Sequence, residues 1–89
     1  MNKYTMDGVW DDGRRLNVGF VGEDLSEATV EGVVAGNRNC DAFTHTVEAE
    51  SEAEAFRALA EELDADTVRD CRDGESREVY TRPGDEVDA

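Results

Sequence analysis

Two cysteines and a single histidine, Cys40, His45 and Cys71, are the residues of this chain best suited to metal binding or nucleophilic chemistry. A structural zinc ion takes four ligands, usually with a close-spaced pair on one turn. Here Cys40 and His45 alternate to opposite sides of one predicted strand, and Cys71 lies on a distant strand. A carboxylate could complete the set, so one hypothesis is a small-ligand or metal-binding site at these three residues. The competing interpretation is two free thiols and a histidine whose ring has a backbone or threonine partner, because the cysteines form no C-x-x-C pair.

Sequence motifs of established catalytic chemistry are absent. The chain contains no G-x-S-x-G, G-x-x-x-x-G-K or H-E-x-x-H pattern. Adjacent acids such as Glu61 and Glu62 carry no acid–base signal in a chain with 23 acidic residues out of 89. We therefore expect a protein that is not an enzyme and that needs no cofactor.

The net charge of −14 restricts the classes of partner. Non-specific nucleic-acid binding depends on clustered Lys and Arg, and a field of this sign repels DNA and RNA. No run approaches the ~18 apolar residues of a membrane span, and the first residues lead into a strand-like pattern without the apolar region of a signal peptide. We expect a cytoplasmic protein that binds neither nucleic acid nor membrane.

The composition resembles that of cytosolic proteins from salt-accumulating haloarchaea, with eight Arg, the single Lys3 and an excess of acids. This resemblance implies a fold that is stable in multimolar KCl, because a Debye length of about 3 Å at about 1 M salt screens the self-repulsion of the chain. It identifies an environment and no particular activity.

Helical periodicity is confined to the stretch from Ser51 to Asp64. Its apolar residues Phe56, Leu59 and Leu63 fall at i, i+3 and i+7, and charged residues cover the remaining sides. Ser51 and Glu54 form a capping box, which predicts where the helix begins. No glycine follows the last apolar residue, so we expect tertiary packing to set the end of the helix.

A first hairpin is predicted by the pair Asp12-Gly13, which favours a type I′ turn. A two-residue loop pairs Val9 with Leu16 and Thr5 with Phe20. This register places one apolar set on the helix side of the sheet, namely Val9, Leu16, Val18 and Phe20. It leaves a second set on the opposite side, namely Tyr4, Met6, Trp10 and Val21.

The second apolar set is a candidate interface. Large exposed apolar patches are uncommon on monomers, and Trp and Tyr are frequent interface anchors. We expect the side of the sheet that carries Trp10 to contact a protein, either a second copy of the chain or another protein. The alternative is that the C-terminal hairpin covers this side.

Further strands complete the predicted sheet. Apolar alternation predicts a third strand over residues 28–34 and a fourth over 40–49, in which Phe43, His45 and Val47 share one side. The predicted fold class is α+β, with the order β-β-β-β-α-β-β, an antiparallel sheet and one helix on one face. We expect a single domain over residues 1–82 and a flexible acidic tail over 83–89.

A second hairpin is predicted at Asp73-Gly74. It pairs Arg72 with Glu75, Asp70 with Arg77, Arg69 with Glu78 and Val68 with Val79. Three opposite-charge pairs and one apolar pair thus agree on one register.

The strand-strand-helix segment from Gly32 to Asp64, with its Ser-x-x-Glu-Ala helix start, resembles that of HicB-type antitoxin domains and of double-stranded RNA-binding domains. RNA-binding domains require a basic helix start, whereas this helix begins with Glu52 and Glu54, so RNA binding is not carried over. The function that the sequence favours is a small non-enzymatic protein-interaction module, with a homodimer as its simplest form. The alternative is the ligand or metal site at Cys40, His45 and Cys71.

Overall fold

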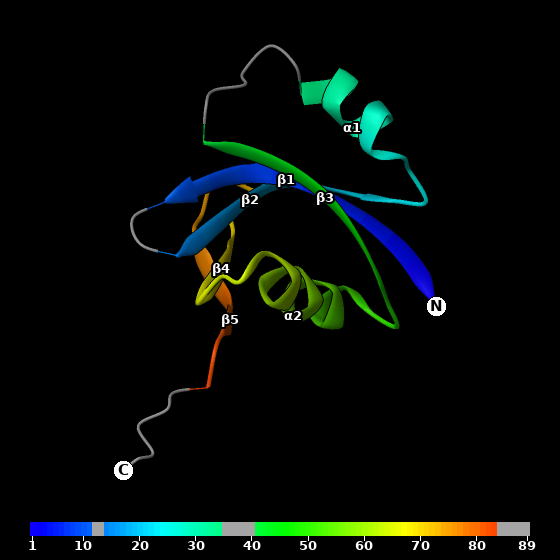
Figure 1. Cartoon of the computed structure of the whole chain (residues 1–89). Coiled ribbons are helices and arrows are strands. Elements are labelled where there is room, and N and C mark those ends of the chain that lie inside the picture. Colours follow the sequence, from blue (N-terminus) through cyan, green and yellow to red (C-terminus); the bar gives the residue numbers. More distant parts are fainter. Residues whose placement is uncertain (12–13, 35–40, 84–89) are drawn as a thin grey trace.

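The computed structural model describes residues 1–11, 14–34 and 41–83. Within these residues the elements are β1 (Asn2–Asp11), β2 (Arg15–Glu23), α1 (Glu27–Val34), β3 (Ala42–Ala49), α2 (Glu52–Leu63), β4 (Thr67–Asp70) and β5 (Arg77–Thr81) (Figure 1). The strands form one mixed sheet in the order β3-β1-β2-β4-β5, in which β2 and β4 run parallel and the other neighbours run antiparallel. The predicted α+β class is confirmed. The purely antiparallel sheet and the order β-β-β-β-α-β-β are wrong.

A helix, α1, replaces the predicted third strand. It begins after Ser26, whose Oγ accepts a hydrogen bond from the N–H of Thr29 at 3.1 Å and whose carbonyl oxygen accepts one from the N–H of Val30 at 3.1 Å. Glu27 adds a negative charge in the first turn, where the helix dipole favours it. The alternation that indicated a strand also places Val30 and Val34 four residues apart, on one side of a helix. The serine N-cap is a local signal that favours the helix.

The first hairpin is paired one residue away from the predicted register. Trp10 lies opposite Leu16 and Asp11 lies opposite Arg15, so three residues rather than two connect the strands. The predicted turn pair, Asp12-Gly13, lies outside the described residues. Because side chains alternate along a strand, this slip moves Leu16 to the same face as Trp10.

A β-bulge in the same hairpin shifts the pairing again. Gly8 lies opposite Val18 while Asp7 lies opposite Phe20, so Gly19 is the extra residue. A Cβ at Gly8 would overlap with a backbone carbonyl oxygen of β2, so the close approach of the strands requires glycine here. The bulge reverses the alternation of β2, and Phe20 therefore lies on the face opposite to Val18.

The predicted amphipathic helix is present as α2. Ser51 caps its start, with Oγ accepting a hydrogen bond from the N–H of Glu54 at 3.3 Å. At its end, Asp64 adopts a left-handed conformation with φ 59°. The N–H groups of Asp64 and Ala65 both donate to the carbonyl oxygen of Ala60, the second at 2.8 Å, which closes the last turn of the helix.

Two arginines from other parts of the chain hold Asp64 in this position. Arg14 Nη1 lies 2.6 Å from Oδ2 of Asp64, and Arg82 Nη2 lies 2.7 Å from Oδ1. The hydrogen bond from Arg82 and the charge of Arg14 lower the pKa of the Asp64 carboxyl below its usual value. Tertiary ion pairs thus compensate an acid at the negative end of the helix dipole.

The C-terminal hairpin has two of the predicted charge pairs in register, but an irregularity between Val68 and Arg69 places Val68 opposite Tyr80 rather than Val79. Asp70 lies opposite Arg77, and Arg69 lies opposite Glu78. Gly74 in the turn has φ +87°, a conformation that favours glycine. The hairpin extends the sheet through the parallel pairing of β4 with β2. The predicted tail falls outside the described residues beyond Pro83.

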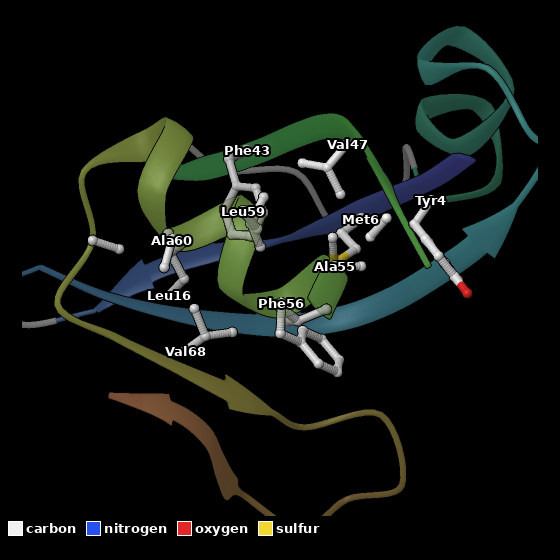
Figure 2. Close-up of a cluster of buried hydrophobic side chains, with 13 residues drawn as sticks. Tyr4, Met6, Leu16, Phe43, Val47, Ala55, Phe56, Leu59, Ala60 and Val68 are labelled. Atoms are coloured by element: carbon white, nitrogen blue, oxygen red, sulfur yellow. The ribbon is translucent and has the colours of Figure 1, made fainter. Parts of the chain in front are cut away.

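One face of the sheet, the α2 face, carries the hydrophobic core (Figure 2). Leu59 from α2 and Leu16 and Val68 from the sheet are completely buried there. The buried cluster consists of Tyr4, Met6, Leu16, Val18, Phe43, Val47, Ala49, Ala55, Phe56, Leu59, Ala60, Ala65 and Val68. α1 lies on the opposite side of the sheet from α2 (Figure 1). Neither of the described helices has the length and apolar character that crossing a membrane requires.

Candidate functional site

The residues with metal-binding or nucleophilic side chains do not come together in the described part of the chain. His45 lies on β3 on the α2 face, with its Nε2 2.7 Å from Oε1 of Glu62. Cys71 follows β4, and its N–H donates to the carbonyl oxygen of Val18 at 2.8 Å. Because β1 and β2 lie between β3 and β4, the backbones of β3 and β4 are about 14 Å apart. Cys40 lies outside the described residues, among which no three His, Cys, Asp or Glu side chains are placed to hold a metal ion.

The predicted interface residues lie in the core rather than on an uncovered face. Tyr4 and Met6 are 5% and 0% exposed, and both point into the cluster beneath α2 (Figure 2). Trp10 and Val21 are half-buried against the same cluster. The prediction that this side of the sheet lacks a cover is therefore wrong. The reason is the register of the first hairpin, which places Tyr4, Met6, Trp10 and Leu16 on one face of the sheet. The predicted register had placed Leu16 on the opposite face.

The opposite side of the sheet, the α1 face, is covered only in part. α1 packs on β1 and β3, and its Val30 is completely buried. Beside the last turn of α1 lies a shallow pocket of about 210 Å³. Asp7, which accepts a hydrogen bond from Thr44 Oγ1, is also at this pocket. The pocket's apolar side chains are Val9, Phe20, Val34 and Ala42.

A polar network joins α1 to the sheet. The hydroxyl of Thr5, which is completely buried, donates to the carbonyl oxygen of Leu25 at 2.6 Å and lies 2.8 Å from the hydroxyl of Thr46. Oε2 of Glu27 accepts a hydrogen bond from the N–H of Thr46 at 3.1 Å. The last contact satisfies a backbone donor of the edge strand β3, which would otherwise remain available to another strand.

The rest of the α1 face is formed by β4, β5 and the first residues of β2, and among the described residues no helix covers it (Figure 1). We call this region the bare half. Arg69 lies next to Asn17 in the register of β4 with β2. The other arginines of the described residues form ion pairs, whereas Arg69 forms none, although Glu78 lies opposite it in the pairing of β4 with β5. Asn17 Oδ1 is buried without a hydrogen-bond partner, and a Cβ added at Gly19 would meet no atom within 4 Å.

The most connected charged cluster lies elsewhere, between the β4–β5 turn and α2. The side chain of Asp70 is 4% exposed, and its Oδ2 lies 2.8 Å from Nη2 of Arg72 and 3.3 Å from Nη2 of Arg77. Arg72 also lies 2.9 Å from Oε1 of Glu52 on α2. Its guanidinium stacks over the ring of Phe56, 5.8 Å from the ring centre.

These contacts explain the charge state of the cluster. Hydrogen bonds from Arg72 hold the pKa of the Asp70 carboxyl well below its usual range, although burial acts in the opposite direction. The hydrogen bonds to Asp70 and Glu52 raise the pKa of Arg72. An acid held ionised by two arginines is unsuited to proton transfer near neutral pH, so the cluster fastens the hairpin to α2.

A second hollow, of about 260 Å³, lies between the end of β3 and the outer side of α2. Its charged lining consists of Glu48, Glu54, Arg57 and Glu61. Nε of Arg57 lies 3.2 Å from Oε2 of Glu61, so the one base of this lining already has an acidic partner. The other lining residues are Met1, Ala49 and Ala58, and the charged side chains are mostly acidic.

Comparison of the chain with protein-family models, with curated proteins and with solved structures finds no match. The α1 face is the part of the described surface on which a binding function can be based. Sequence reasoning missed this face because it treated residues 28–34 as a strand. The available signal was Ser26 three residues before Thr29, a side-chain pair that caps a helix start.

Proposed function

We propose that this protein is a small, non-enzymatic interaction module that binds another protein molecule through the bare half and the pocket beside it. The observation that carries the proposal is the position of Arg69, the described arginine without an ion pair, on the same face as the half-buried Val9 and Phe20. Interface cores are enriched in aromatic residues and Arg and depleted in acids. The pocket and the bare half together present an aromatic ring and an arginine on one face, with Glu78 opposite Arg69 on β5.

The dimensions of the pocket favour a protein surface over a small molecule. Its volume of about 210 Å³ is smaller than the roughly 300 to 1,000 Å³ of drug-sized ligand sites. The pocket adjoins the bare half, in which Asn17 and Arg69 lie side by side. No described contact favours the metal hypothesis, since His45 is already paired with Glu62.

We also propose that the module works in a salt-rich cytoplasm. The net charge of −14 and the exposed acids on α2, such as Glu54 and Glu61, support this proposal. Circular dichroism during titration with KCl tests it, with an increase in ordered structure as the expected result. Full structure in dilute buffer, unchanged by added KCl, would contradict it.

Site-specific photo-crosslinking in the cells that normally express the protein tests the interaction. A benzophenone-bearing phenylalanine replaces Phe20, which conserves an aromatic ring at the pocket. The matched control carries the same group at Arg57, whose side chain is 66% exposed on the far face of α2. We expect a crosslinked product of discrete mass from position 20 and none from position 57.

The mass of the crosslinked product, less the mass of one chain, gives the mass of the partner. No discrete product from position 20, or the same products from both positions, would contradict the proposed function.

A further inference from the structure

The two outer strands of the sheet, β3 and β5, differ in how well another strand could pair with them. An outer strand presents one row of backbone N–H and C=O groups that no neighbouring strand binds, and a strand of another molecule can pair with this row. β5 is five residues long, its pairing with β4 is irregular at Val79, and it carries the charges of Arg77 and Glu78. A short, irregular and charged edge disfavours further pairing.

β3 has a longer and more regular edge. It is eight residues long, each of the eight pairs with β1 in one unbroken register, and it contains neither Pro nor Lys nor Arg. Phe43, Thr44, Thr46 and Val47 are residue types that favour strands. The strand itself is therefore a suitable template for a further strand, and its protection has to come from elsewhere in the chain.

One backbone donor of the β3 edge is bound by a side chain of α1. The N–H of Thr46 donates to Oε2 of Glu27 at 3.1 Å. Thr46 lies opposite Thr5 of β1, and because its N–H bonds to Glu27 rather than to β1, this N–H faces the open side of β3. The carboxylate of Glu27 thus takes the position that a carbonyl oxygen of an added strand would occupy.

The contacts of the neighbouring residues hold Glu27 beside this edge. The carbonyl oxygen of Leu25 accepts the hydrogen bond from the buried hydroxyl of Thr5 at 2.6 Å. Ser26 caps the first turn of α1, and Val30 is completely buried where α1 packs on β1 and β3 (Figure 1). The backbone on both sides of Glu27 is therefore fixed on the sheet, and its side chain reaches over the edge of β3.

We infer that Glu27 guards the β3 edge, and that its carboxylate keeps a second copy of the chain from adding its own β3 to the sheet. An incoming strand has to displace this carboxylate and break its hydrogen bond to Thr46 before it can pair. A second copy is the strand that meets this edge in a solution of the protein, and its β3 has the same regular, strand-favouring sequence. The inference is independent of the proposed function, which concerns the pocket and the bare half.

Replacement of Glu27 by alanine tests the guard. Glu27 is exposed, so E27A should keep the circular dichroism spectrum of the wild-type protein. We expect hydrogen exchange of the Thr46 amide to accelerate by about fivefold or more, which corresponds to the loss of one hydrogen bond. Light scattering at high protein concentration and constant KCl should give a larger mean mass for E27A than for the wild-type protein.

Two control variants separate the hydrogen bond from the charge. E27Q removes the same charge as E27A but keeps a side-chain oxygen that can accept from Thr46, so its Thr46 exchange rate should stay within about twofold of the wild-type rate. E31A removes the charge of another exposed acid of α1 and should leave both exchange and mass unchanged. Equal association of E27A, E27Q and E31A would overturn the inference, because the effect would then be one of net charge.

Hydrogen exchange at two protein concentrations locates the new contact. In E27A, the amides of β3 should exchange more slowly in concentrated than in dilute solution, whereas the amides of β5 should exchange at the same rate in both. Protection that appears in β5 and not in β3 would overturn the inference. An E27A protein with the mass and the Thr46 exchange rate of the wild-type protein would also overturn it.

Discussion

On the α2 face of the sheet, thirteen apolar side chains of the described residues form one buried cluster, whereas on the α1 face Val30 is buried beside a row of polar side chains. The buried residues of that row, Thr5 and Asp7, form hydrogen bonds with Thr46 and Thr44 on β3. Both faces belong to the same strands, so the strand backbone does not cause the difference. It comes from which side chains each face presents and from the length of the helix that covers it.

The two kinds of packing contribute differently to the fold. Burial of apolar surface is worth roughly 25 cal/mol per Å², so the cluster under α2 supplies most of the favourable free energy of folding. A hydrogen bond contributes only about 1 kcal/mol net, but it fixes the position of α1 on β1 and β3. The α2 face therefore supplies most of the stability, whereas exposed residues of the α1 face, such as Val33, can be altered with little loss of stability.

The largest expected effect is from Leu59→Ala on the α2 face. Leu59 is completely buried at the centre of the cluster, so its truncation leaves a cavity and should lower the free energy of unfolding by about 2 to 5 kcal/mol. Urea denaturation at constant KCl measures the change. A loss below about 1 kcal/mol would contradict the conclusion that the cluster under α2 supplies most of the stability.

The next effect concerns Asp70, the buried acid on the α2 face. Asp70→Asn keeps the shape but removes the charge that binds Arg72 and Arg77, and it should cost about 1 to 3 kcal/mol of stability near neutral pH. Because Arg72 lowers the pKa of Asp70 in the folded protein, this stabilisation is fully present above about pH 5 and is lost as the pH falls through the folded-state pKa. Urea denaturation between about pH 6 and pH 3 should show a steeper loss for the wild-type protein than for the variant. Equal slopes would mean that this carboxylate is not the group that titrates.

A smaller effect is expected from Thr5→Val on the α1 face. The substitution keeps the volume but removes the hydroxyl that donates to Leu25 and lies beside Thr46, and it should cost about 1 to 2 kcal/mol. Hydrogen exchange of the α1 amides gives a local measurement, and it should accelerate more than exchange in α2. Equal acceleration in both helices would indicate that the network supports the whole fold rather than the position of α1.

The smallest effect on the stability of the chain is expected from Val33→Glu. Because Val33 is 62% exposed, the substitution should change the free energy of unfolding by no more than about 0.5 kcal/mol. Urea denaturation at constant KCl measures the change. A large loss of stability would contradict the assignment of α1 as a weakly packed element.

Part of the fold could be predicted because its signals are local. The capping pair Ser51 and Glu54 and the periodic apolar residues identify α2 within one short window. The charge pair of Asp70 with Arg77 identifies the register of the last hairpin across a single turn. Alternation along β3 correctly places His45 on the α2 side of the sheet.

The candidate site could not be predicted in the same way. Its position depends on the one-residue slip that moves Leu16 to the face of Trp10, and on the bulge that moves Phe20 to the other face. An Asp-Gly pair is compatible with two-residue and three-residue loops, and the two alternatives place opposite faces of β2 against the core. Tyr4 and Met6, which were predicted to form an interface, therefore lie in the core, and the candidate site lies on the face that carries Phe20.

The sequence by itself determined the α+β class, the start of α2 and the charge pairs of the C-terminal hairpin, because each depends on residues only a few positions apart. The tertiary structure decided the helical state of residues 27–34, the parallel pairing of β2 with β4 and the face to which each residue of β2 points. These features depend on contacts between residues far apart in the chain, such as the carboxylate of Glu27 at the edge of β3 and Arg14 at the end of α2. Local propensity leaves such alternatives close in free energy, and burial of one shared core selects among them.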